Sequence, residues 1–241
     1  MSIENQQDTH DYIPHIGETR QYWRDMILGV NDGLVSIFLL VVGVVGGGLD
    51  PGEVFLTAVA GAIAGAVSMA AGEYLATKSQ DEVLESELRL ERTHIQHFKD
   101  REIDQLRGFF TDMGVGDDRL EGVIAGFEDN DEALLNAMAA LEFGVVESER
   151  RSPYRAMAAS GLLFLAGSLP SVLPFALIDS AFAAVIWATV LTLSGLFIVG
   201  VVKASVANSH RVRSGLENMV IAGFGGLIAW VVGDAVGASL V

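Results

Sequence analysis

Long runs of apolar residues alternate with polar segments along this chain. Five runs are long enough to cross a hydrocarbon layer of about 30 Å, which requires about 20 helical residues. None has the strict apolar–polar alternation of a membrane β-barrel strand. The pattern therefore predicts an all-α membrane protein with five transmembrane helices, at Ile27–Leu49, Val54–Thr77, Ala156–Ile178, Ala181–Val202 and Met219–Val241.

The polar segment between the second and third runs has a helical pattern of its own. Apolar residues recur there at helical spacings, as at Leu88, Ile95 and Phe98. No glycine or proline occurs between Glu73 and Gly108, so we expect the second membrane helix to continue into this segment. The pattern predicts a small domain of three or four helices, inserted between the second and third spans.

Composition separates a membrane part from an acidic part. Hydrophobic residues make up 51% of the 241 residues, yet the net charge is −16, and residues 79–152 carry 19 Asp and Glu against 8 Lys and Arg. Such acidity argues against nucleic acid as a partner, and the absence of cysteine excludes disulfides and thiolate metal sites. We expect a polar N-terminal tail (1–22), two membrane helices (23–78), the acidic helical domain (79–152) and three membrane helices (153–241).

The basic residues predict an orientation in the membrane. If the chain crosses the membrane five times, all 15 basic residues lie on the side that holds the N-terminus and the insert. The loops on the other side and the C-terminus have none. Lys and Arg in short loops mark the cytoplasmic side. We therefore expect the N-terminus and the insert to be cytoplasmic and the C-terminus to lie outside.

Ionisable residues inside the predicted spans are candidates for an ion path, because each costs at least a few kcal/mol at membrane depth. Asp32 lies in the first span with Asp25 two turns earlier, and Met69 lies one turn before Glu73 in the second. Carboxylates suit hard divalent cations, and a thioether shifts the preference toward transition metals. Alternatively, Glu73 reaches interfacial water, and Asp234, close to the C-terminus, is simply hydrated.

The insert contains a second group of candidate metal ligands. Glu91 and His94 are three residues apart, and Glu102 follows after about three helical turns, near the same face. An antiparallel helix would bring Glu142 and Glu147 back toward them. The alternative is an ordinary solvated acidic surface. Glu-x-x-His occurs only once in the chain, which disfavours a di-iron bundle, because that needs the motif on two helices.

Three motifs resemble the vacuolar iron transporter family. They are DMILGVNDGLVS at residues 25–36, SMAAGEY at 68–74, and Glu91-x-x-His94 with Arg101-Glu102 in the insert. The resemblance extends from about Tyr22 to the C-terminus. It implies a homodimer in which ferrous iron or another divalent metal is exchanged for protons along a path between the two copies of the first span.

By position, the resemblance carries over two sets of residues. Asp25, Asp32, Met69 and Glu73 match the family's path, and the insert ligands that match are Glu91, Glu102 and Glu142. The insert departs from the family pattern, since His94 and Gln105 stand where glutamates are expected. An imidazole still binds iron, manganese or zinc, so we include His94 among the ligands.

These observations predict a transporter and not an enzyme. We expect a proton-coupled exporter that removes Fe²⁺, or Mn²⁺, from the cytoplasm, with Fe²⁺, Mn²⁺ or Zn²⁺ as bound substrate and no prosthetic group. The alternative is a membrane-anchored, metal-binding oxidase or sensor that acts through the insert. The acidic first 22 residues lack the basic region of a signal peptide, so we expect them to remain on the protein as a tail. The use of three lysines against twelve arginines favours a prokaryotic cell membrane.

Overall fold

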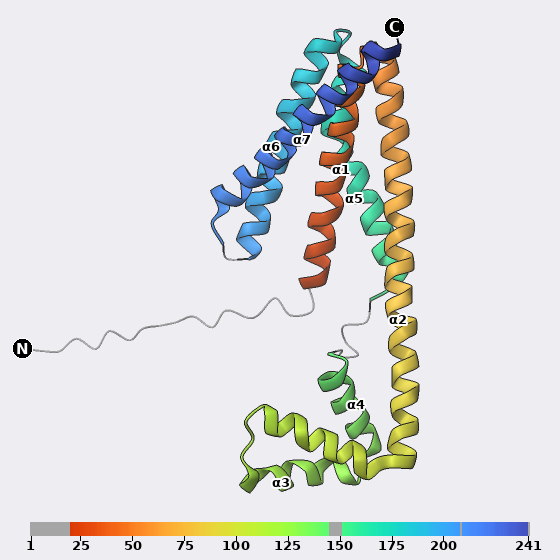
Figure 1. Cartoon of the computed structure of the whole chain (residues 1–241), viewed down its shortest axis with the longest axis vertical. Helices are drawn as coiled ribbons and strands as arrows, with labels where there is room; N and C mark the ends of the chain where they lie inside the picture. Colours follow the sequence, from red (N-terminus) through yellow and green to blue (C-terminus); the bar gives the residue numbers. More distant parts are fainter. Residues whose placement is uncertain (1–19, 145–150, 208, 241) are drawn as a thin grey trace, which may run out of the picture.

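Seven helices account for the regular structure in the computed structural model, which describes residues 20–144, 151–207 and 209–240. Five of them are long and apolar enough to span a membrane, namely α1, α2, α5, α6 and α7, as the sequence predicts. Figure 1 shows these five as a bundle, with α3 and α4 beyond one end of it. The helices are α1 (Arg20–Gly46), α2 (Pro51–Asp112), α3 (Asp117–Glu128), α4 (Asp131–Glu142), α5 (Pro153–Leu177), α6 (Ala181–Val206) and α7 (Arg211–Leu240).

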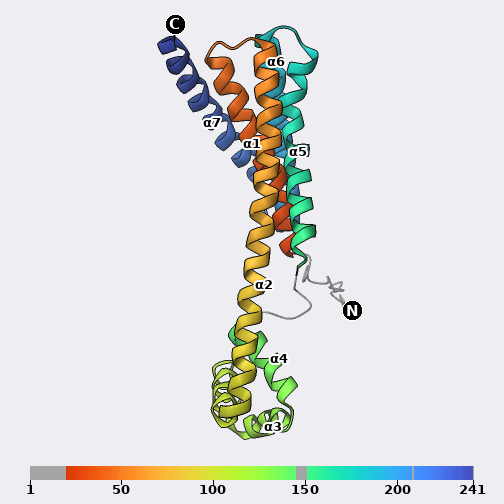
Figure 2. The ribbon, with the colours of Figure 1, turned by 90° about the vertical axis from the view of Figure 1, so that its right-hand side faces the viewer.

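The longest helix, α2, connects the bundle to the insert (Figure 2). It begins with a capping box, in which the Asp50 carboxylate accepts from the Glu53 backbone N–H and the Glu53 side chain accepts from that of Asp50. Its straight part, residues 51–97, is about 70 Å long at 1.5 Å per residue, far more than a bilayer core requires. At Phe98 the backbone leaves helical geometry (φ −137°, ψ 35°) and the helix bends.

Within the bundle, α1 is the central helix and packs against α2, α5, α6 and α7. Glycines permit the closest approaches: a Cβ at Gly33 would overlap the carbonyl oxygen of Phe164 in α5, and one at Gly233 in α7 would overlap that of Gly43. Such backbone contact is typical of membrane helices, whose association depends on van der Waals packing. The arrangement buries the Asp25 carboxylate of α1 beside α2 and the start of α5.

The outward faces of the bundle are apolar. Leu56, Leu177 and Phe224 are among many large hydrophobic side chains left exposed on α2, α5, α6 and α7. An apolar surface of this extent is unusual for a soluble monomer and fits a hydrocarbon environment. Of the five spans, α7 is the least covered by other helices.

The insert has its own apolar core between the outer part of α2 and helices α3 and α4. Leu106, Ile124, Leu134 and Met138 are fully or almost fully buried there. Phe98, which the spacing placed on the same apolar face, is instead exposed, because it occupies the bend of α2. The bend turns its side chain away from the core that the flanking residues form.

The helix ends differ from the limits of the apolar runs. The first helix begins at Arg20 rather than Ile27 and ends at Gly46 rather than Leu49, where Gly48 adopts a φ of +85°. The last begins at Arg211 rather than Met219. Hydrophobicity reports the thickness of the apolar layer, whereas backbone hydrogen bonding continues the helices into polar flanking sequence.

Candidate functional site

Three of the predicted ligands meet in the insert and form what we call the insert cluster: Glu91, His94 and Glu102. One potential ligand atom from each lies within 4.8 Å of the others. His94 Nδ1 is 3.8 Å from Glu91 Oε2 and 3.6 Å from Glu102 Oε1. Both carboxylates are buried and the imidazole is half-buried. Two carboxylates and one imidazole form a donor set for iron, manganese or zinc.

The insert cluster depends on the bend of α2. In a straight helix, Glu91 and Glu102 would be about 16 Å apart along the axis, even though they share a face. At Phe98 the end of α2 turns sideways from the line of the long helix (Figure 1), and Glu91 and Glu102 lie together across this bend. The sequence therefore predicted that Glu91 and Glu102 lie near each other, but for the wrong reason: they do not lie on one face of a straight helix but on two segments that run in different directions.

The electrostatics of the insert cluster favour a bound cation. Burial, together with the neighbouring carboxylates of Glu102 and Glu142, raises the pKa of Glu91 from 4.5 to about 7. Within the described part of the chain, no Lys or Arg pairs with Glu91 or Glu102, and the buried Glu91 Oε1 accepts no hydrogen bond. Glu142, at the exposed end of α4, is near enough to influence Glu91. A divalent ion would neutralise this excess negative charge.

The sequence also drew attention to Gln105 and Glu147 in the insert. Gln105, which stands where the family resemblance leads us to expect a glutamate, is exposed on the outer part of α2. Glu147, predicted as a ligand, lies outside the described residues. The geometry of the insert cluster therefore rests on Glu91, His94 and Glu102, with Glu142 nearby.

A second group lies where α1 and α2 face the start of α5; we call Asp25, Glu73 and Arg151 the mouth cluster. Arg151 Nη2 donates to Asp25 Oδ2 and to Glu73 Oε1, the latter at 3.2 Å. Asp25 Oδ1 also accepts from the exposed Arg24 at 3.2 Å, and the buried Thr77 hydroxyl lies 3.5 Å from Glu73 Oε1. The structure thus unites two of the predicted path carboxylates through a guanidinium.

The two other path candidates, Asp32 and Met69, are not part of the mouth cluster. Asp32, two turns beyond Asp25, accepts a hydrogen bond from Ser36 at 2.8 Å, and among the described residues no hydrogen bond or ion pair joins it to Asp25, Met69 or Glu73. Met69 is partly buried against the bundle core.

Two further polar residues lie in the spans, Asp234 in α7 and Asn31 in α1. Asp234 is exposed near the end of α7. The buried Asn31 Oδ1, beside Asp32, accepts no hydrogen bond in the described part of the chain and adds an unused acceptor at this depth.

Sequence reasoning missed Arg151. It contributed only to the count of basic residues in the insert, and it is 126 residues away from Asp25 in the chain. One local signal was available: Arg151 directly precedes Ser152 and Pro153, which are the N-cap and first residue of α5. An arginine there is held at the end of a membrane helix, where its side chain reaches the first turns of α1 and the interior of α2.

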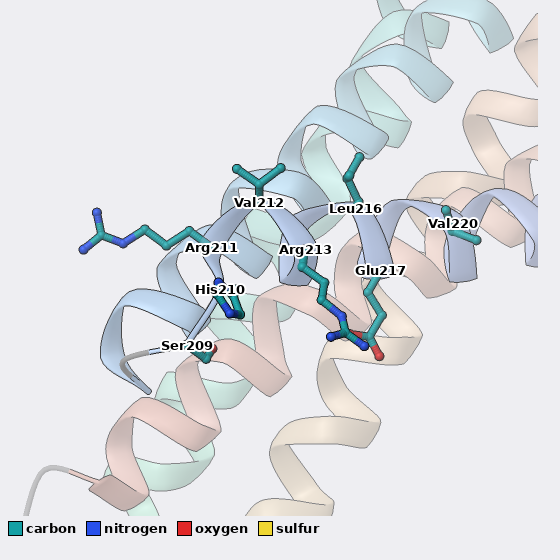
Figure 3. Close-up of a pocket in the computed structure, with 8 residues that line it drawn as sticks. All are labelled: Ser209, His210, Arg211, Val212, Arg213, Leu216, Glu217 and Val220. Carbon is teal, nitrogen blue, oxygen red and sulfur yellow. The ribbon is translucent and has the colours of Figure 1, made fainter.

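A separate surface hollow lies at the turn between α6 and α7 (Figure 3). Its polar lining comprises Ser209, His210, Arg211, Arg213 and Glu217, with apolar Val212, Leu216 and Val220 between them. None of the predicted path or insert ligands that the structure describes lines it. The close-up shows the Arg213 and Glu217 side chains directed toward each other, so the hollow combines opposite charges with an apolar surface.

Comparison with known proteins gives consistent matches across the chain. A family model described as the VIT family matches residues 23–234. Vacuolar iron transporter 1 of Arabidopsis thaliana is 31% identical over 201 residues, covering 82% of this chain and 79% of that protein. Vacuolar iron transporter 2 of Oryza sativa subsp. japonica is 31% identical over 216 residues, covering 88% and 87%. A vacuolar iron transporter of Toxoplasma gondii is 25% identical over 239 residues, covering 94% and 79%.

Proposed function

Since this chain belongs to the VIT family, which is made up of transporters and not of enzymes, we propose that it carries Fe²⁺, or Mn²⁺, across a membrane. The vacuolar iron transporters to which it is similar and the five membrane-length helices support metal-ion transport. The alternative of an anchored oxidase or sensor is set aside on the family's activity. The single Glu-x-x-His motif argues in the same direction.

The observation that carries this proposal is the insert cluster and its position. Its two buried carboxylates and imidazole converge without a paired Lys or Arg in the described chain. The insert lies beyond the end of the bundle where α1 and α5 begin, which is also the end that holds the mouth cluster (Figures 1 and 2). In our proposal, the insert cluster collects the metal ion and supplies it to the bundle.

We propose a path that continues from the mouth cluster to Asp32 along α1. Met69, one turn before Glu73 on α2, would add a sulfur ligand that favours a transition metal over Mg²⁺ or Ca²⁺. A second copy of the chain would complete the path, with the two copies of α1 facing each other across a two-fold axis. Opposed Asp32 carboxylates would then bind one ion between them.

Proton coupling and direction complete the proposal. We propose that the insert is cytoplasmic, that the C-terminus lies outside and that metal leaves the cytoplasm. Moving two charges against an inside-negative potential costs about 4.6 kcal/mol per 100 mV, and inward proton movement offsets part of this. Composition favours a prokaryotic cell membrane as the compartment, whereas the relatives above are named for vacuoles of eukaryotes.

The decisive test is Asp32→Asn in proteoliposomes that contain the full chain. We expect the variant to lose Fe²⁺ and Mn²⁺ flux but to keep metal binding at the insert cluster. Asp234→Asn is the matched control, because it removes the same charge from an exposed position and is expected to keep its flux. Normal flux in Asp32→Asn would contradict the proposed path, and flux that ignores a pH gradient would contradict proton coupling.

A further inference from the structure

The mouth cluster already contains a cation that belongs to the protein. The Arg151 side chain is only 8% exposed, and it bonds to one carboxylate from α1 and one from α2. A guanidinium remains charged at any physiological pH, so it cannot vacate this position by losing a proton. It can leave only by moving its side chain.

A metal ion and Arg151 cannot occupy the mouth cluster together. A small divalent ion that bound Asp25 Oδ2 and Glu73 Oε1 would lie about 2.0–2.2 Å from each oxygen. Arg151 Nη2 is within hydrogen-bond distance of both of these atoms. The ion and the guanidinium nitrogen would therefore compete for the same space between the oxygens, and their like charges would repel each other.

Charge determines which ions win this competition. A monovalent ion that replaced the guanidinium would bring no additional charge, would lose its hydration and would break charge-assisted hydrogen bonds, so it gains nothing. A divalent ion doubles the positive charge between the same two carboxylates. We propose that Arg151 is a tethered counter-cation that fills the mouth of the ion path and admits divalent cations while excluding monovalent ones.

This inference rests on the proposed transport function and assigns Arg151 a part in its specificity. If Arg151 is only a structural tie between α1, α2 and α5, its removal loosens the bundle without changing which ions enter. As a counter-cation, it makes two further predictions. Its removal should strengthen divalent binding at the mouth cluster, and it should let sodium compete.

The experiment measures Mn²⁺ transport by Arg151→Gln in proteoliposomes, with sodium chloride or N-methylglucamine chloride at equal ionic strength. We expect the Mn²⁺ concentration for half-maximal rate to fall about tenfold or more, because a charge-assisted hydrogen bond no longer has to be broken. Sodium, but not the bulky organic cation, should inhibit the variant and leave the wild type unaffected. Arg155→Gln is the matched control, one turn away, exposed and of equal charge change.

Arg151→Lys covers the case in which Arg151→Gln does not fold, because it keeps the charge but loses the planar fork that joins two carboxylates. It should lower the half-maximal Mn²⁺ concentration by a smaller amount and, because the positive charge remains, still exclude sodium. An unchanged half-maximal concentration in whichever of the two variants folds, or an unchanged sodium response in Arg151→Gln, would overturn the proposal.

A failure of the proposed function itself would be recognised separately. If the wild-type protein moves neither Fe²⁺ nor Mn²⁺, the transport proposal fails. Equilibrium Mn²⁺ binding to the solubilised protein then tests Arg151 directly, in a Glu102→Gln background that weakens the insert cluster. Tighter binding in Arg151→Gln supports the counter-cation, and equal affinity overturns it.

Discussion

The insert cluster and the mouth cluster each bring two carboxylates together, but they compensate the charge differently. At the mouth, Arg151 bonds to both Asp25 and Glu73. In the insert, no Lys or Arg of the described chain pairs with Glu91 or Glu102, and the pKa of Glu91 rises to about 7. In our proposal, an ion that enters the insert cluster therefore competes with a proton, whereas one that enters the mouth cluster competes with a guanidinium.

If both clusters bind the transported ion, as we propose, this difference explains how the ion can bind at each of them and still be released. A site whose competitor is a proton responds to pH, and a site whose competitor is an arginine responds to the charge of the ion. Conduction and transport require binding that is strong enough for entry and weak enough for release. Each competitor weakens binding of the ion at its own site.

The largest expected effect concerns the insert ligands. Glu102→Gln removes one of two buried carboxylates, so we expect Mn²⁺ affinity of the insert to fall at least about 10- to 100-fold, the loss typical even for partners of metal ligands. Isothermal titration of the solubilised full chain in an Asp32→Asn background measures it. Glu132→Gln, an exposed position on α4, is the control. Equal losses in both would show that general acidity, and not the insert cluster, holds the metal.

The next effect is the pH dependence of insert binding. A carboxyl group with a pKa of about 7 is about 10% ionised at pH 6 and about 90% ionised at pH 8. Protons compete with the metal for Glu91, so affinity should be about tenfold weaker at pH 6. The same titration at both pH values tests this, and Glu91→Gln should bind more weakly but with a flatter profile. If the wild-type affinity is the same at pH 6 and pH 8, protons do not compete with the metal at the insert cluster, and the contrast with the mouth cluster fails.

The sequence predicted the membrane part better than the parts that assemble the two clusters. Five apolar runs were recognisable because bilayer thickness imposes a minimum length on every span. The bend at Phe98 had no such signal, since neither glycine nor proline lies nearby, and the core that α3 and α4 form with the outer part of α2 brings together residues distant in the chain. The contact of Arg151 with Asp25 joins distant parts of the chain, which local periodicity cannot report.

A smaller effect is expected on folding stability: neutralising a carboxylate should stabilise the insert cluster but destabilise the mouth cluster. Because the pKa of Glu91 is raised from 4.5 to about 7, the folded insert holds more protons than the unfolded chain between these pH values. Stability of the metal-free insert therefore falls as pH rises through this window. At pH 8, Glu91→Gln should slow amide hydrogen exchange in α3 and α4 several-fold, and the difference should vanish near pH 4.5.

The mouth cluster should respond in the opposite direction. Asp25→Asn removes one carboxylate partner of the buried Arg151, and the loss of a partner from a buried charge is destabilising. We expect faster amide exchange at the start of α5 in this variant at pH 8. If both Glu91→Gln and Asp25→Asn were stabilising, each cluster would carry an excess of negative charge. Arg151 would then not compensate the mouth cluster, and the contrast between the two clusters would fail.

The smallest effect is expected for an ion pair outside both clusters. Lys99 Nζ lies 2.6 Å from Asp131 Oδ1 and ties the outer part of α2 to the start of α4, but the carboxylate is largely exposed. Water and salt screen such pairs, so Lys99→Gln should cost only about 0.2–1 kcal/mol and nothing measurable near molar salt. Thermal unfolding with and without salt measures the loss, and Mn²⁺ affinity should change less than about twofold. A larger, salt-resistant loss of affinity would mean that the position of α4, and not the donor set alone, sets the strength of the insert cluster.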